Sequence, residues 1–254
     1  MTCYTCEPRW ADMLCCIYEA WSGKKGFENI RLITEPVGQY SLFDEYIHVD
    51  YDERKAASVE DAICRKISPE VYGRLAYCSM AYEEDALDII YRVLILAFAM
   101  GPDAVEMVQY RDVMRFRTVL KRVESEAHHF LEFLRFHSVA GGILTAHIEP
   151  KSRIVSALGS YFSDRMPSEN WMIVDDVHRE ALVHPKDAEY YIRYLTEEEL
   201  KELAETEKIR DGYNNLWQVF FDSIAIEQRI NPKCQRTLFP LWMRKHADEF
   251  IQKK

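Results

Sequence analysis

The chain has 254 residues, of which 48% are hydrophobic and 29% are charged, values typical of a globular protein. The formal net charge of −10 argues against broad electrostatic attraction to phosphate backbones. Residues 111–165, however, contain nine Lys and Arg residues and only six acidic ones. Any surface for nucleic acid is therefore expected to be local and to lie in the middle of the chain.

Neither a membrane span nor a secretory leader is expected. The longest apolar run, Val93–Met100, is far too short to cross a bilayer. The opening segment "MTCYTCEPRW" lacks a basic region followed by an apolar stretch. We therefore expect a cytoplasmic protein without membrane contact.

The chain has seven cysteines, an odd number that favours reduced thiols over a disulfide framework. Cys3 and Cys6 have the CxxC spacing of metal and redox sites. A zinc site normally needs a second pair, and Cys15-Cys16 lies in an apolar helical stretch. The sequence leaves open whether Cys3 and Cys6 bind anything, and ordinary thiols are the alternative.

The first hundred residues are predicted to be mainly helical. Ser68 followed by Pro69 is typical of a helix start, and Gly101-Pro102 is typical of a helix end. "SLFDEYIHV" has the composition of a strand. The helices are expected at about residues 11–21, 52–66, 68–80 and 84–100.

A single long helix is predicted at about residues 110–138. Apolar residues recur there at alternating steps of three and four, which is the core stripe of an amphipathic helix. Gly141-Gly142 is expected to end the helix. The stripe consists of Val113, Phe116, Leu120, Val123, Ala127, Phe130 and Leu134.

Strands are predicted after the long helix. "ILTAHIE" alternates as a strand does, "WMIVDD" reads as a central strand, and "REALVH" as its hairpin partner. Helices are expected at residues 152–166, within 196–229 and at the C-terminus, with a turn-rich loop at 231–240. These elements predict an α+β fold, mainly helical, with a small central β-sheet on which the long helix packs. The expected parts are residues 1–105, mainly helical, and an α+β core at 106–254, packed together.

Two adjacent histidines on the long helix raise the question of a metal or acid–base site. His128 and His129 lie about 100° apart around a helix, so they do not readily bind one ion. His128 and Glu132, at i and i+4, would need a third ligand from elsewhere. A salt-bridge layer, in which Arg135 pairs with a carboxylate, is the alternative. We predict no metal and no cofactor.

Polar residues at strand ends are the remaining candidates for catalysis. His147 and Glu149 share one face of their strand, and Asp175 ends the central strand. Nucleases hold magnesium with carboxylates and a lysine on neighbouring strands. In Glu149-Pro-Lys151, however, the proline breaks the strand where the lysine would be needed. A turn-capping role is the alternative for Asp175.

The segment "IEQRINPKCQ" gathers polar groups around a helix end. Such a loop reads a phosphate or a base edge, or it caps the helix and holds the C-terminus in place. Its polar members are Glu227, Arg229, Asn231 and Gln235.

Four blocks of the sequence resemble a family of uncharacterised bacterial proteins described as DNA metabolism or DNA repair proteins. The blocks are "ExHHFxxFLRF", "HIEP", "YFSDRMPxxxWMIVDDVHR" and "LWQVFFDSIAIEQRINPKCQRTLFPLWMRKH". The resemblance is clearest between residues 119 and 246. Near the start, family members often carry an aromatic residue followed by Asp-Gly and Ser or Thr, where this chain has Tyr4-Thr-Cys-Glu-Pro.

The resemblance implies context more than mechanism. Members of the family are paired with a radical SAM protein of DNA modification or repair, and related domains are fused to uracil-DNA-glycosylase-like domains. The family's recurring polar positions map onto Glu126, His128, Arg135, Glu149, Arg165, Asp175, Arg179, Glu227, Arg229, Asn231 and Gln235.

Three hypotheses follow. The first is an accessory protein of DNA repair or modification that acts with a radical SAM partner through a polar surface. The residues expected to bind on that surface are Arg135, Arg165, Arg179, Glu227, Arg229, Asn231 and Gln235. The second is a hydrolase, either a nuclease or a base-processing enzyme, with candidate catalytic residues His128, His147, Glu149 and Asp175. The third is a purely structural adaptor.

Overall fold

The structure is a computed structural model, and it describes residues 1–139, 142–206 and 231–246. The chain divides into two compact units, residues 1–124 and residues 125–254, called here the N-terminal unit and the C-terminal unit. The division falls inside helix α5 (Arg111–Phe133). The predicted boundary at residues 105 and 106 precedes α5, so the first part of that helix belongs with the N-terminal unit.

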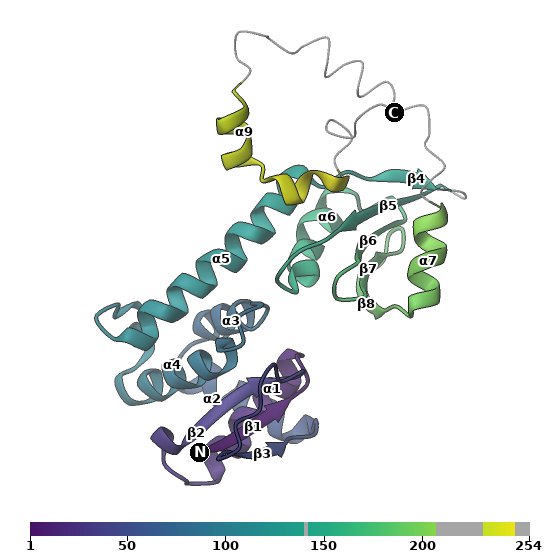
Figure 1. Cartoon of the computed structure of the whole chain (residues 1–254). Helices are drawn as coiled ribbons and strands as arrows, with labels where there is room; N and C mark the ends of the chain where they lie inside the picture. The colour runs from purple at the N-terminus through teal and green to yellow at the C-terminus, as the bar shows by residue number, and fades with distance from the viewer. Residues whose placement is uncertain (140–141, 207–230, 247–254) are drawn as a thin grey trace. The chain divides into compact units, whose positions relative to one another are not determined.

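The N-terminal unit contains a three-stranded parallel sheet (Figure 1). Its order is β2 (Ile30–Thr34), β1 (Thr2–Cys6) and β3 (Glu45–His48). All five residues of β1 are buried, as expected for the central strand of a parallel sheet. Strand β3 confirms the strand predicted near residue 45, whereas the sequence predicts no strand at β1 or β2.

The predicted helices of the N-terminal unit are confirmed, together with their starting signals. Asp52 accepts hydrogen bonds from the amides of Arg54 and Lys55, and Ser68 Oγ accepts one from the amide of Val71. These contacts satisfy amides that have no partner inside a helix. The helices are α1 (Trp10–Ser22), α2 (Glu53–Lys66), α3 (Pro69–Cys78) and α4 (Ala86–Met100). Among the described residues, no helix is both long and apolar enough to cross a membrane.

Helix α5 confirms the predicted long helix and its apolar stripe. Val113, Phe116 and Leu120 are buried in the core of the N-terminal unit. The stripe continues through Phe130, which is also buried. The predicted end at Gly141-Gly142 is wrong, because the helix ends at Phe133 and the chain turns directly into strand β4 (His137–Val139).

The C-terminal unit contains a five-stranded mixed sheet in the order β4-β5-β6-β7-β8 (Figure 1). Strands β5 and β6 are parallel, and the other neighbours are antiparallel. Strands β5, β6 and β7 confirm the three predicted strands, and β6 is central as predicted. Their bounds are β5 (Ile143–Ile148), β6 (Trp171–Asp175), β7 (Glu180–His184) and β8 (Tyr191–Tyr194).

Helical segments pack against this sheet and complete the predicted α+β class. The 3-10 turn η3 (Ile154–Leu158) contacts β6 and β7 and leads into α6 (Gly159–Arg165). Helix α7 (Glu197–Thr206) places Leu200 and Leu203 against an apolar cluster that includes Val174.

The last described segment differs from the prediction of a turn-rich loop. Residues Pro232–Leu238 form helix α9, followed by the 3-10 turn η5 (Leu241–His246). Asn231 Oδ1 accepts a hydrogen bond from the amide of Cys234 at 3.1 Å, so Asn231 caps α9. The helix predicted at about residues 210–229 lies outside the described residues.

Candidate functional site

The end of α5 is tied to the loop that follows β5. The Glu126 carboxylate accepts hydrogen bonds from the amides of Lys151 and Ser152, at 2.6 and 3.2 Å. His128 lies on the exposed side of α5, with Nε2 3.3 Å from Glu132 Oε1. His128 therefore forms a surface pair with Glu132 and is not part of a buried layer.

A groove opens beside the end of α5. It encloses a cavity of about 1050 Å³, and its walls come from α5, the segment that follows α5, and α6. We call it the α5–α6 groove. It contains two of the predicted binding residues, Arg135 and Arg165. Its other lining residues are His128, His129, Leu131, Glu132, Phe133, Leu134, Phe136, Tyr161, Phe162 and Met166.

The wall of the α5–α6 groove rests on a chain of packed aromatic rings. The ring of Phe136 lies 5.3 Å from that of Phe162 and 6.1 Å from that of Trp171, in edge-to-face geometry. Trp171 in turn stacks on His184 at 4.8 Å. Such pairs each add about 0.5–1.5 kcal/mol beyond the burial of their area, so they stabilise this wall of the groove.

The two arginines of the groove are held by short local contacts. Arg165 Nη1 lies 3.2 Å from the hydroxyl oxygen of Tyr161, one turn earlier on α6. Arg135 donates to the carbonyl oxygens of Glu132 and Leu134, near the end of α5. Tyr161 is 40% exposed, and its ring lies 5.1 Å from that of Phe162 in edge-to-face geometry.

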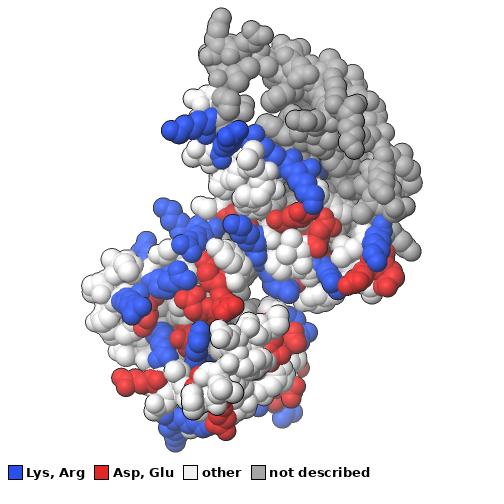
Figure 2. All heavy atoms as spheres, in the orientation of Figure 1, with Lys and Arg blue, Asp and Glu red and all other residues white. Residues whose placement is uncertain are grey.

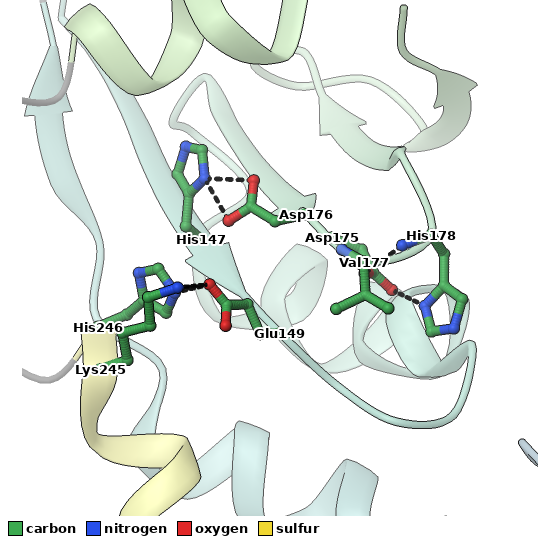
Figure 3. A network of polar contacts seen from close by, with 8 residues as sticks. All are labelled: His147, Glu149, Asp175, Asp176, Val177, His178, Lys245 and His246. Carbon is green, nitrogen blue, oxygen red and sulfur yellow. Dashed lines mark hydrogen bonds and ion pairs between the residues drawn. The ribbon is translucent and has the colours of Figure 1, made fainter. Parts of the chain in front are cut away.

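A second group of polar side chains lies where β5 and β6 end. Side chains alternate along a strand, and the register pairs His147 with Val174 and Ile148 with Asp175. His147, Glu149 and Asp176 therefore share one face, and Asp175 points to the other. His147 Nδ1 lies 3.0 Å from both carboxylate oxygens of Asp176 (Figure 3).

Turn η5 brings two more groups to this face. His246 Nε2 lies 3.3 Å from Glu149 Oε1, and Lys245 forms an ion pair with the same oxygen (Figure 3). One ligand atom each from Glu149, Asp176 and His246 lies within 4.8 Å of the other two. We call these three residues the Glu149 cluster. Their two carboxylates and one imidazole are groups that can bind a metal ion.

Burial and charge act against each other in the Glu149 cluster. Burial raises the pKa of Glu149, but Lys245 and His246 outweigh it and lower the pKa below its usual value. Burial lowers the pKa of His246, although Glu149 partly opposes this. The cluster therefore presents ionised Glu149 beside a histidine whose neutral form is favoured.

A small cavity lies beside Glu149 and His246. It has a volume of about 20 Å³ and is lined by His147, Glu149 and His246 together with residues of α5 and η5. Phe133, Leu134 and Arg135 line both this cavity and the α5–α6 groove. The two sites are therefore neighbours around Arg135.

Asp175, predicted as a catalytic candidate, has a local structural role. Its side chain is fully buried, and Oδ1 accepts hydrogen bonds from the amides of Val177 and His178 at 3.0 Å. Oδ2 lies 2.7 Å from His178 Nδ1. Asp175 thus caps the β6–β7 turn, away from the group around His147 (Figure 3). The structure brings together His147 and Glu149 of the predicted catalytic set, with Asp176 in the position expected for Asp175.

The other predicted binding residues do not line the groove or the small cavity in the described structure. Arg179 lies on the β6–β7 turn, exposed, with Nη2 2.8 Å from Glu197 Oε1. Asn231 caps α9, and Gln235 lies within α9. Glu227 and Arg229 lie outside the described residues.

The N-terminal cysteines lie in the core of the N-terminal unit. Cys3 and Cys6 are buried on β1, and residues three apart on a strand point to opposite faces. Cys6 contacts Cys16, and this contact together with burial raises the pKa of Cys16 well above its usual value. Because the thiolate is the form that binds metals and attacks electrophiles, these thiols are suited to packing.

The described surface carries mixed charge. On the face drawn in Figure 2, Lys and Arg side chains are interspersed with Asp and Glu on both units. No broad basic area stands out on this face.

Sequence reasoning missed Tyr161, Lys245 and His246, and of the adjacent pair Asp175-Asp176 it favoured Asp175. Asp176 follows from strand alternation once β5 and β6 are known to be parallel neighbours. Lys245 and His246 lie almost a hundred residues from Glu149, and no spacing pattern links them. Tyr161 carries a weak signal, because it lies one helical turn before Arg165.

A search of curated proteins finds no match to the chain. The model of the family DUF4130, described as a domain of unknown function, matches residues 84–249, which is well over half of the chain and includes the groove and the Glu149 cluster. The chain therefore belongs to the DUF4130 family.

Proposed function

We propose that this chain is an accessory protein of DNA repair or DNA modification that binds single-stranded nucleic acid in the α5–α6 groove and acts with a radical SAM partner. The family resemblance of the four sequence blocks supports the DNA context and the partner. The observation that carries the mode of binding is the groove itself, where Arg135 and Arg165 lie with aromatic rings around one open cavity.

The side chains of the groove match what single strands require. Proteins bind single strands by combining cations that track the phosphates with aromatic faces on which bases stack. Arg135 and Arg165 supply the cations, and Tyr161 supplies an exposed ring. A net charge of −10 disfavours a general duplex-binding surface, which would need many phosphate contacts.

The first test is the affinity of fluorescein-labelled DNA for the full chain, measured by anisotropy on single-stranded, duplex and damaged forms. We expect the tightest binding for a single strand, with an affinity that falls as salt rises, by about 0.7 log units per log unit of salt for each phosphate contacted. An affinity that does not depend on salt, or no affinity for any DNA form with the partner present, contradicts the proposal.

Substitutions separate the groove from the rest of the surface. The double variant Arg135→Gln/Arg165→Gln is expected to weaken binding by about 10-fold or more and to flatten the salt dependence. Arg179→Gln is the matched control, because this exposed arginine of the same unit pairs with Glu197. An equal loss of affinity in the Arg179→Gln control would show that the nucleic-acid site lies outside the groove.

Tyr161 tests stacking separately from charge. Tyr161→Ala removes the ring and is expected to weaken binding by about 10-fold, within the range of about 1–3 kcal/mol measured for base stacking. Tyr161→Phe keeps the ring and loses the hydroxyl that contacts Arg165, so it is expected to retain most of the affinity.

The partner is tested by co-purification with the neighbouring radical SAM protein. Recovery of that enzyme with the chain supports the accessory role. Recovery of the enzyme without nucleic-acid binding by either the chain or the complex favours the structural adaptor instead.

A further inference from the structure

The Glu149 cluster has a composition that neither the groove nor the family explains. Glu149 directly follows β5, Asp176 directly follows β6 and His246 ends η5, so three separate segments converge on one point. Each is partly buried, which shields the site from bulk water and still leaves it accessible. Convergence of this kind costs desolvation of charged groups unless something compensates them.

We propose that Glu149, Asp176 and His246 bind a first-row divalent cation, of which Mn²⁺ and Zn²⁺ are the appropriate probes. Two carboxylates with one imidazole are a donor set for such ions, whereas Mg²⁺ and Ca²⁺ prefer oxygen donors alone. This inference goes beyond the proposed function, because it requires no nucleic acid.

The distances fit a shared ion. Two donors bound at about 2.1 Å to a tetrahedral ion lie about 3.4 Å apart. Glu149 Oε1 and His246 Nε2 are 3.3 Å apart, and all three ligand atoms lie within 4.8 Å of one another. The separation of the Asp176 ligand atom from the other two is bounded at 4.8 Å, so the proposal requires its carboxylate to close on binding any part of that separation beyond about 3.4 Å.

A supporting contact orients one of the ligands. His147 Nδ1 lies 3.0 Å from both oxygens of Asp176, and the His147 side chain is only 4% exposed. Ligating carboxylates are themselves held by hydrogen bonds in metal sites, and loss of such a partner costs about 10–100-fold in affinity. His147 is therefore a positioning residue for Asp176.

The cavity beside the cluster has room for the ion's remaining partner. Its volume of about 20 Å³ exceeds the roughly 15 Å³ that one water molecule requires. Three protein ligands leave a fourth position for water or for an oxygen of a ligand. Because Arg135 lines this cavity as well as the groove, the fourth position lies near the proposed path of a phosphate.

Lys245 now supplies the positive charge that neutralises Glu149. Its side chain is 64% exposed, so it is free to turn toward water when a cation takes its place. The competing account is that Lys245 and His246 form an ion-pair group with Glu149 and that no ion binds.

The chain contains a matched control for this distinction. His128 and Glu132 form an imidazole–carboxylate pair with the same Nε2–Oε1 distance of 3.3 Å. Both residues are exposed on α5, and this pair is not part of a three-ligand group among the described residues. A pair alone does not make a complete site.

The experiment is a titration of the untagged full chain with Mn²⁺. Binding is measured by electron paramagnetic resonance, as the loss of the signal of free Mn²⁺. We expect one saturable Mn²⁺ per chain, displaced by Zn²⁺. Glu149→Gln and Asp176→Asn should each weaken binding by about 10-fold or more. Circular dichroism without metal confirms that each variant is folded, and the second variant serves where the first does not fold.

The remaining variants decide between the two accounts. Lys245→Gln should leave Mn²⁺ binding intact or tighten it, because the competing charge is gone. Glu132→Gln should leave it unchanged. The inference is overturned if the wild type binds no saturable Mn²⁺ or Zn²⁺, or if Glu132→Gln weakens binding as much as Glu149→Gln. Since no DNA is present, its failure is separate from failure of the proposed function.

Discussion

The two units place polar groups very differently. Among the described residues, the N-terminal unit buries the acidic side chains of Asp12 and Glu83, which are 4% and 8% exposed and pair with Arg9 and Arg122. The C-terminal unit buries four acidic or imidazole side chains, His147, Asp175, Glu180 and His184. Burying an ionisable group is costly unless it is paired, and each of these four has a partner: Asp176 for His147, His178 for Asp175, Arg153 for Glu180 and the Glu169 carbonyl oxygen for His184.

The difference distinguishes the N-terminal unit, which is built around an apolar core, from the C-terminal unit, where polar side chains face a cavity. The N-terminal unit packs its helices around one apolar core, and its arginines pair with acids at the surface. In the C-terminal unit, one buried carboxylate, Asp175, shapes a turn, and another group of polar residues opens toward a cavity. Polar groups that are buried and yet face a cavity mark a functional site more strongly than exposed ones do.

The largest effect on the free energy of unfolding is expected for Asp175, the fully buried carboxylate of the C-terminal unit. Asp175→Ala leaves two amides and the His178 ring nitrogen without their acceptor, and should lower the free energy of unfolding by about 3 kcal/mol. Urea unfolding measures this. Asp164→Ala, which changes an exposed residue of the same unit, should stay within about 0.5 kcal/mol of the wild type. Equal, small effects would remove the structural role assigned to Asp175.

A smaller effect on the free energy of unfolding is expected from two glutamates, one in each unit. Hydrogen bonding to Arg74 lowers the pKa of exposed Glu106 in the N-terminal unit, whereas burial raises the pKa of Glu180 in the C-terminal unit. Glu106 therefore stabilises the fold above about pH 4.5, and this contribution is lost as the pH falls through its lowered pKa. For Glu180 the contribution is present below about pH 4.5 and is lost as the pH rises through its raised pKa.

Unfolding measured between pH 3 and pH 7 on Glu106→Gln and Glu180→Gln tests this contrast. At neutral pH, Glu106→Gln should cost less than about 1 kcal/mol, because surface ion pairs contribute little. The wild type should lose stability relative to Glu180→Gln as the pH rises. Parallel pH profiles for the two variants would show that the units do not differ in this way.

Local signals in the sequence predict much of the fold and little of the site. Periodicity identifies α5, and the Ser68-Pro69 signal identifies the start of α3, because both depend on neighbours within one helical turn. The same kind of signal, Asn231 followed by Pro232, precedes α9, where the composition of residues 231–240 predicts a turn-rich loop. Strand β1 escapes prediction because "TCYTC" is short and has no alternation of apolar and polar residues.

The candidate site depends on contacts that no local pattern contains. His147 and Glu149 follow from alternation along one strand, but the choice of Asp176 over Asp175 depends on the register between β5 and β6. His246 reaches Glu149 from 97 residues away in the sequence. Arg135 and Arg165 were predicted to bind, yet the groove that joins them forms only when α6 packs beside the end of α5.

The most direct test of the central claim is hydrogen–deuterium exchange of the full chain with and without a saturating single-stranded oligonucleotide. The account predicts slower exchange at residues 128–136 and 159–166, which form the α5–α6 groove, and unchanged exchange in α1 to α4 of the N-terminal unit. Protection confined to the N-terminal unit, or no protection at the groove while the oligonucleotide is bound, would contradict it.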